Sequence, residues 1–180
     1  MKPSVATPVW RRTGLVVAGL AVTGTLGALA PAVAGTANVF RGDLSDLAPT
    51  VAGPFDHASA KLVLVGGHGD AANIVLVVKG VDRSAVGQTF GAHLHTGPCV
   101  AGNGAAAGPH YNHSGVVPPV VDRSTEVWLD FTVTHGGTGQ SSWHDGWVPT
   151  HGQRSVVIHQ NPTAADGTAG ARIACLPVEW

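Results

Sequence analysis

Four histidines stand in short stretches whose spacing suits one metal site. His93 and His95 are two residues apart, and alternate residues of an extended strand point to the same side of a sheet. His110 follows the turn-forming Ala-Gly-Pro, and His159 ends the strand-like apolar run 156–158. Four imidazoles without a thiolate suit copper or zinc. The His-x-His pair alone would equally fit polar residues that merely alternate along a strand.

The stretches around these histidines resemble a known family. Gly-Ala-His-Leu-His, Ala-Gly-Pro-His-Tyr-Asn, Val-Val-Ile-His and Ala-Gly-Ala-Arg-Ile-Ala-Cys occur in that order. Together they resemble the copper/zinc superoxide dismutases over roughly residues 61–178. The resemblance implies that the copper ligands are His93, His95, His110 and His159. It also implies that Arg172 is a catalytic residue that flanks the copper and attracts the superoxide anion, which a permanent charge with planar donors suits.

The resemblance is poor at the positions that bind zinc in the zinc-containing members of the family. In zinc-containing members, two further histidines and an aspartate follow the bridging histidine at set spacings. Counted from His110, those spacings fall on Pro118, Val127 and Asp130, and neither proline nor valine has a ligating side chain. Copper is therefore the expected cofactor, because it changes oxidation state on imidazole ligands, and zinc is not expected. The alternative left open is a degenerate zinc site drawn from His113, Asp122, Glu126 or Asp130.

A short connection between His159 and Arg172 is a second departure from the family, since only twelve residues lie between them. Most members have a longer loop there, which steers superoxide and carries an aspartate bonded to histidines of both metal sites. The matching place in this chain is Thr163. Asp166 is the alternative, although Ala-Asp-Gly is at least as typical of a turn. Shortened loops of this type resemble those of copper-only relatives.

Residues 1–34 have the pattern of a secretory signal peptide. Arg11 and Arg12 precede an apolar run at 15–29, and Ala-Val-Ala at 32–34 is a cleavage signature. The run is too short and too interrupted for a membrane span, and the paired arginines leave the Sec and Tat routes both open. Cleavage after Ala34 leaves seven basic against eleven acidic residues, a formal charge of −4, without a basic patch for nucleic acid. The oligomeric state is not indicated.

The two cysteines, Cys99 and Cys175, are expected to form a disulfide in an exported chain, although two buried free thiols also fit the count. The resemblance supports the disulfide. Family members have a bridge from the loop after His-x-His to the strand after the motif arginine, and these two cysteines stand at those places.

The rest of the chain predicts an all-β fold. Residues 61–65 and 73–78 read as a hairpin, 126–133 alternates as a half-buried strand, and 155–159 and 173–178 read as further strands. The resemblance implies an eight-stranded Greek-key flattened barrel or sandwich. We expect a signal peptide at 1–34, an N-terminal arm at 35–55 and the superoxide dismutase-like domain at 56–180.

The sequence therefore predicts an exported copper-dependent superoxide dismutase, with superoxide as its small-molecule substrate and without a complete zinc site. The alternative is a copper-binding or structural domain of the same fold that lacks turnover. A zinc hydrolase is disfavoured, because no carboxylate stands in the motif as a general base.

Overall fold

A computed structural model of the chain describes residues 36–48, 52–66 and 71–180. The predicted signal peptide at 1–34 lies outside them. Their regular secondary structure is almost entirely β, and the all-β prediction is confirmed. The strands are β1 (Thr36–Asp43), β2 (Ser45–Asp46), β3 (Ser59–Gly66), β4 (Ala72–Lys79), β5 (Thr89–Phe90), β6 (Ala92–His95), β7 (Phe131–Thr132), β8 (Thr138–Asp145), β9 (Gln153–His159) and β10 (Arg172–Glu179). Two short 3₁₀ helices accompany them, η1 (Arg83–Ala85) and η2 (Gly104–Ala107).

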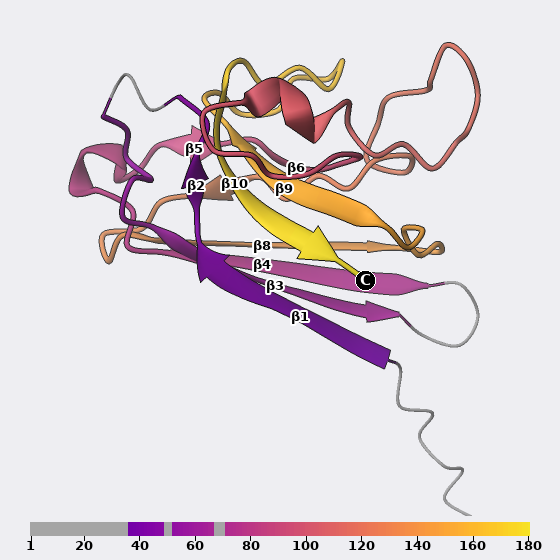
Figure 1. The fold of residues 1–180 in the computed structure, drawn as a ribbon, viewed down its shortest axis with the longest axis horizontal. Coiled ribbons are helices and arrows are strands. Elements are labelled where there is room, and N and C mark those ends of the chain that lie inside the picture. The colour runs from indigo at the N-terminus through magenta and orange to yellow at the C-terminus, as the bar shows by residue number, and fades with distance from the viewer. Residues whose placement is uncertain (1–35, 49–51, 67–70) are drawn as a thin grey trace, which may run out of the picture. The chain divides into compact units, whose positions relative to one another are not determined.

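Eight of these strands form two four-stranded antiparallel sheets, in the orders β1-β3-β4-β8 and β2-β10-β9-β6. Figure 1 shows them as two layers. The strands β5 and β7 form a separate pair. The two sheets are not closed into one barrel, so the sandwich form of the prediction describes the chain better than the barrel. Among the described residues, we find no helix that combines the length and apolarity needed to cross a membrane.

The core lies between the two sheets and follows from the alternation along their strands. In β4, Ile74, Leu76 and Val78 are fully buried, whereas the residues between them are only partly buried. β-branched and large aliphatic side chains suit such a half-buried pleated surface. Leu94 of β6 and Ile158 of β9 belong to the same buried cluster on the opposite sheet. The predicted hairpin of 61–65 and 73–78 is confirmed, because β3 and β4 pair along their whole length.

The sheet β2-β10-β9-β6 is covered on its other side as well. A second buried cluster contains Leu47, Ala107 and Val157 together with the disulfide of Cys99 and Cys175. This cluster packs the loop that carries η2 against β9 and β10. Residues of β9 from Ser155 to His159 are therefore buried on both faces, which explains why this strand reads as an uninterrupted apolar run.

The segment at 126–133 differs from the predicted strand. Val127, Leu129, Phe131 and Val133 are buried in the core as the alternation predicts, but only β7 is regular strand. Upstream of it, Trp128 makes just an isolated bridge to His93. Trp128 is itself buried, so this part of the segment has no solvent-exposed face of the predicted kind.

Three strands lie where the sequence did not predict them. The segment expected as an arm at 35–55 contains β1 and β2, and β1 pairs along the length of β3. The strand β8 pairs along β4 although it begins Thr-Gly-Gln-Ser-Ser, without an apolar alternation. The ring of Phe131 occupies the space where a side chain at Gly139 would stand, so this strand needs a glycine at that point.

Candidate metal centre

The fold brings the four predicted histidines together. His93 and His95 lie on β6, His159 ends β9 beside it, and His110 follows η2 and makes a bridge to His95. One ring nitrogen from each histidine lies within 4.8 Å of the others. His93 and His95 are 0% exposed and His159 is 4% exposed, whereas His110 is half-buried. Among the described residues, this is the cluster whose side chains are placed to hold a metal ion.

Three of the imidazoles are held by their Nδ1 atoms. His95 Nδ1 lies 3.0 Å from the carbonyl oxygen of Gly108, and His159 Nδ1 lies 3.2 Å from that of Gly170. His110 Nδ1 lies 2.8 Å from Glu126 Oε2. Because these oxygens only accept hydrogen bonds, each Nδ1 carries the proton and each Nε2 keeps its lone pair. Three Nε2 lone pairs are thus left for a shared cation.

The unprotonated ring nitrogens are placed to bind a metal ion, and they cannot form hydrogen bonds with one another. His95 Nε2 and His159 Nε2 lie 3.2 Å apart, and with both protons on Nδ1 there is no hydrogen to join them. The Nδ1 atom of His93 is buried and lacks a hydrogen-bond partner in the described part of the chain. A buried polar atom without a partner is costly unless something else satisfies it. The residues present therefore fit a cation bound by one Nδ1 and three Nε2 atoms.

Burial keeps the innermost imidazoles neutral. Burial, with smaller contributions from the neighbouring histidines, lowers the pKa of His93 to about 2. Burial likewise lowers the pKa of His95 to about 3 and that of His159 to about 4. An imidazole must be neutral to ligate a metal, so these three are ready to bind at neutral pH without first releasing a proton.

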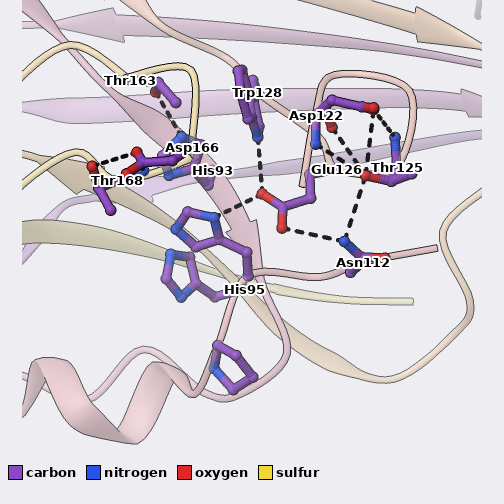
Figure 2. A network of polar contacts seen from close by, with 12 residues as sticks. His93, His95, Asn112, Asp122, Thr125, Glu126, Trp128, Thr163, Asp166 and Thr168 are labelled. Carbon is purple, nitrogen blue, oxygen red and sulfur yellow. Dashed lines mark hydrogen bonds and ion pairs between the residues drawn. The ribbon is translucent and has the colours of Figure 1, made fainter. Parts of the chain in front are cut away.

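A buried carboxylate stands behind His110. Glu126 is 3% exposed, and its Oε2 accepts hydrogen bonds from His110 Nδ1 and, at 2.9 Å, from Trp128 Nε1. Asn112 Nδ2 donates to Oε1 at 3.3 Å. Figure 2 shows Glu126 between Trp128 and Asn112. Burial alone would raise the pKa of Glu126, but the hydrogen bonds from these three residues lower it overall. The carboxylate is therefore ionised at neutral pH and holds the proton on His110 Nδ1.

The other residues considered for a zinc site do not join His110. Asp122 accepts hydrogen bonds from Ser124 and Thr125 within its own turn, and His113 is exposed and stacks on Trp147 with ring centroids 4.4 Å apart. The alternation at 126–133 places Asp130 on the outer, solvated face of the predicted strand, and that expectation is wrong. Its side chain is only 22% exposed and accepts hydrogen bonds from the backbone and hydroxyl of Thr163.

Arg172 opens β10 opposite His159 and lines a surface groove together with His110 and His159. Its Nη1 donates to the carbonyl oxygen of Gly104 at 2.7 Å, which fixes the guanidinium on the loop that carries η2. The predicted disulfide between Cys99 and Cys175 is present. It ties that loop to β10, so the arginine and the carbonyl that orients it belong to one covalently joined unit.

Comparison with known proteins found similarity at the level of the fold and none at the level of sequence families. No protein-family model and no curated protein sequence matches the chain. Among solved structures, the clock protein EA4 is similar with a TM-score of 0.52 and 13% identity, over 82% of this chain and 96% of that one. Two mutants of superoxide dismutase 5 from Candida albicans have TM-scores of 0.46 and 0.45. The first mutant is 15% identical, over 82% of this chain and 93% of its own chain. The second is 16% identical, over 80% of this chain and 88% of its own chain.

The fold, a sandwich of two antiparallel sheets, is shared with the clock protein EA4. At these identities the likeness shows the fold alone. Within it, the short connection between β9 and β10 places Thr163 beside His93, with Thr163 Oγ1 2.7 Å from His93 Nε2. Asp166 instead accepts hydrogen bonds from Thr168 in a turn, so it does not take the place of the bridging aspartate.

Two parts of the site were missed by sequence reasoning. Glu126 was named only as an open alternative for zinc. Trp128, which the alternation at 126–133 places on the outer face of the predicted strand, was not named as a site residue. The signal in the chain is that an acidic residue opens the alternating segment 126–133, two positions before a tryptophan. Their contact with His110 is a tertiary one, and neighbouring sequence does not reveal it.

Proposed function

We propose that the chain is an exported copper-dependent superoxide dismutase that works without zinc. The observation that carries the proposal is the convergence of four histidine nitrogens within 4.8 Å, beside a groove lined by Arg172. An all-nitrogen donor set of imidazoles suits copper. Copper bound there would supply one-electron redox chemistry. The net reaction converts two superoxide ions and two protons into dioxygen and hydrogen peroxide.

Arg172 supplies the fixed charge that this reaction needs. Its guanidinium is permanently cationic, and the carbonyl oxygen of Gly104 holds it at the groove beside His159. A cation in a groove raises the local concentration of a small anion, and dissolved salt screens that attraction. Arg172 therefore draws superoxide toward the histidines and orients it there.

Glu126 supports a centre without zinc. The nitrogen of His110 that faces away from the other three histidines is its Nδ1, which Glu126 already engages. A second metal on that nitrogen would have to displace both the proton and the carboxylate. With the proton in place, His110 acts as an ordinary ligand through Nε2. Glu126 keeps the ring oriented in the way that carboxylates orient metal-binding histidines generally.

The proposed export rests on the predicted signal peptide and agrees with the disulfide. Structural disulfides form and persist in oxidising compartments. Mass spectrometry of the protein recovered from the culture medium tests the export, and a mature chain that starts near Gly35 is expected. A chain that retains residues 1–34 and stays in the cytosol would contradict it.

The test of the proposed function is the metal content and turnover of the secreted protein. After loading with copper, we expect about one copper per chain and rapid superoxide consumption, both lost in His159→Ala. The matched control is His144→Ala, which removes an exposed histidine of β8 that is not part of the cluster. Full turnover in His159→Ala would remove the assignment. One bound copper without turnover would leave a copper-binding domain.

A further inference from the structure

We propose that Thr163 is a positioning residue that sets the tautomer of His93 and so presents its Nδ1 to the metal. The part of this inference that concerns the metal rests on the proposed function. The part that concerns the tautomer of His93 follows from the hydrogen bonds of the chain itself. Thr163 belongs to the short connection between β9 and β10, and Figure 2 shows it directly beside His93.

The direction of the hydrogen bonds follows from Asp130. The hydroxyl of Thr163 donates to Asp130 Oδ1 at 2.6 Å, and the backbone N–H of Thr163 donates to Oδ2 at 2.8 Å. A carboxylate only accepts hydrogen bonds, so the single hydroxyl hydrogen of Thr163 is used there. The contact of 2.7 Å between Thr163 Oγ1 and His93 Nε2 must then be one in which the imidazole N–H donates.

Asp130 does not reach His93 itself. Its Oδ1 lies 4.0 Å from His93 Nε2, which is too long for a hydrogen bond. The hydroxyl of Thr163 bridges this gap. Asp130 is anchored from a second side, because the backbone N–H of Ala92 donates to Oδ1 at 3.3 Å. We call the hydrogen bonds from Asp130 through Thr163 to His93 the relay. The relay joins the segment before β7, the start of β6 and the β9–β10 connection.

The relay gives His93 a protonation opposite to that of the other three histidines. With its proton on Nε2, His93 has its lone pair on Nδ1, the buried atom without a partner among the described residues. The other three histidines carry their protons on Nδ1. If Thr163 lost its hydroxyl, Nε2–H of His93 would lose its acceptor. Neither ring nitrogen would then have a partner, so nothing would hold the proton on Nε2. Part of the protein would carry it on Nδ1, where that hydrogen points at the metal position.

The position of Thr163 is fixed by close packing around Gly91. A side chain at Gly91 would stand 2.9 Å from Thr163 Oγ1 and 2.8 Å from the carbonyl oxygen of Asn161, both too close for a carbon atom. The N–H of Gly91 donates to that same carbonyl at 2.8 Å. The connection therefore lies directly on the chain before β6, and this brings the hydroxyl to His93.

The decisive experiment compares Thr163→Val with Thr163→Ser and with Thr168→Val. Valine keeps the shape and the backbone hydrogen bond of Thr163 but removes the hydroxyl, and serine restores the hydroxyl. Thr168→Val removes a hydroxyl from the same connection that bonds Asp166 and not a histidine. The first measurement is the ¹⁵N NMR spectrum of the histidine rings in the metal-free protein. The second is Cu(II) affinity by competition with a chelator.

We expect His93 of the wild-type protein, Thr163→Ser and Thr168→Val to carry its proton on Nε2. In Thr163→Val we expect a measurable population with the proton on Nδ1 and a fall in copper affinity of about 10- to 100-fold, the usual effect of losing a partner of a ligating histidine. A Thr163→Val protein with the Nε2–H tautomer and unchanged copper affinity would overturn the proposal. An equal loss in Thr168→Val would also overturn it, because a loosened connection would then explain the effect.

This design separates the two proposals. If the chain binds no copper, the NMR measurement still decides whether Thr163 sets the tautomer. If the chain is an active copper enzyme but Thr163→Val retains the tautomer and affinity of the wild type, the relay fails while the proposed function stands.

Discussion

Acidification should destabilise the metal-free protein well before its carboxylates titrate. In the folded chain the pKa of His93 is lowered to about 2, that of His95 to about 3 and that of His159 to about 4. In the unfolded chain each imidazole returns to its ordinary pKa of about 6.5. Between pH 6.5 and 4 the unfolded state therefore binds protons that the folded state does not, so stability falls as the pH falls.

The size of this effect follows from the same pKa values. Lowering the pH from 7 to 5 costs about 2 kcal/mol for each of the three imidazoles, since one pKa unit corresponds to about 1.4 kcal/mol. The sum of about 6 kcal/mol is comparable to the whole stability of an ordinary domain. The metal-free protein should therefore be close to unfolding at pH 5.

The assay is urea denaturation of the metal-free, disulfide-intact protein at pH 7, 6 and 5, followed by tryptophan fluorescence and extrapolated linearly to water. In His159→Gln the loss between pH 7 and pH 5 should shrink by about 2 kcal/mol. A free energy of unfolding that changes by less than about 1 kcal/mol over this range in the wild type would refute the neutral, buried state of these histidines.

Three further predictions test neighbouring parts of the account. Arg172→Ala should keep the copper but slow superoxide consumption and weaken the dependence of the rate on ionic strength. The control Arg83→Ala, at an exposed residue, should behave as the wild type. A dependence on ionic strength equal to that of the wild type in Arg172→Ala would show that Arg172 does not guide superoxide. Glu126→Gln should lower copper affinity by about 10- to 100-fold, because the amide lacks the charge that holds the proton on the ligating His110; unaltered affinity in a chelator competition would contradict this. Replacing both cysteines by alanine should lower the free energy of unfolding by about 4 kcal/mol, because the disulfide closes a loop with a sequence separation of 76; a denaturation midpoint equal to that of the wild type would rule this out.

The features that were predictable from sequence depend on local spacing. The placement of His93 and His95 on one face follows from strand periodicity, and the hairpin of β3 and β4 follows from apolar segments around a glycine-rich turn. The convergence with His110 and His159 came from the family resemblance, because the distances in sequence are too long for periodicity to determine.

The features that were missed depend on tertiary partners. In β8 the buried position 139 is a glycine rather than an apolar side chain, because Phe131, from another segment, fills the space above it. Asp130 alternates as a solvated residue would, but Thr163, which is 33 residues away, covers it. Glu126 likewise becomes part of the site only because Asn112 and Trp128 bury its carboxylate beside His110. Each depends on a partner that the adjacent sequence does not specify.

The most direct test of the central claim is a titration of superoxide consumption against copper, with zinc excluded by a selective chelator. Stopped-flow decay of superoxide is measured on the secreted protein after each addition. The account predicts activity that rises in proportion to bound copper, ends at about one copper per chain and does not increase when zinc is added. Full copper occupancy without superoxide consumption, or activity that appears only after zinc is supplied, would contradict it.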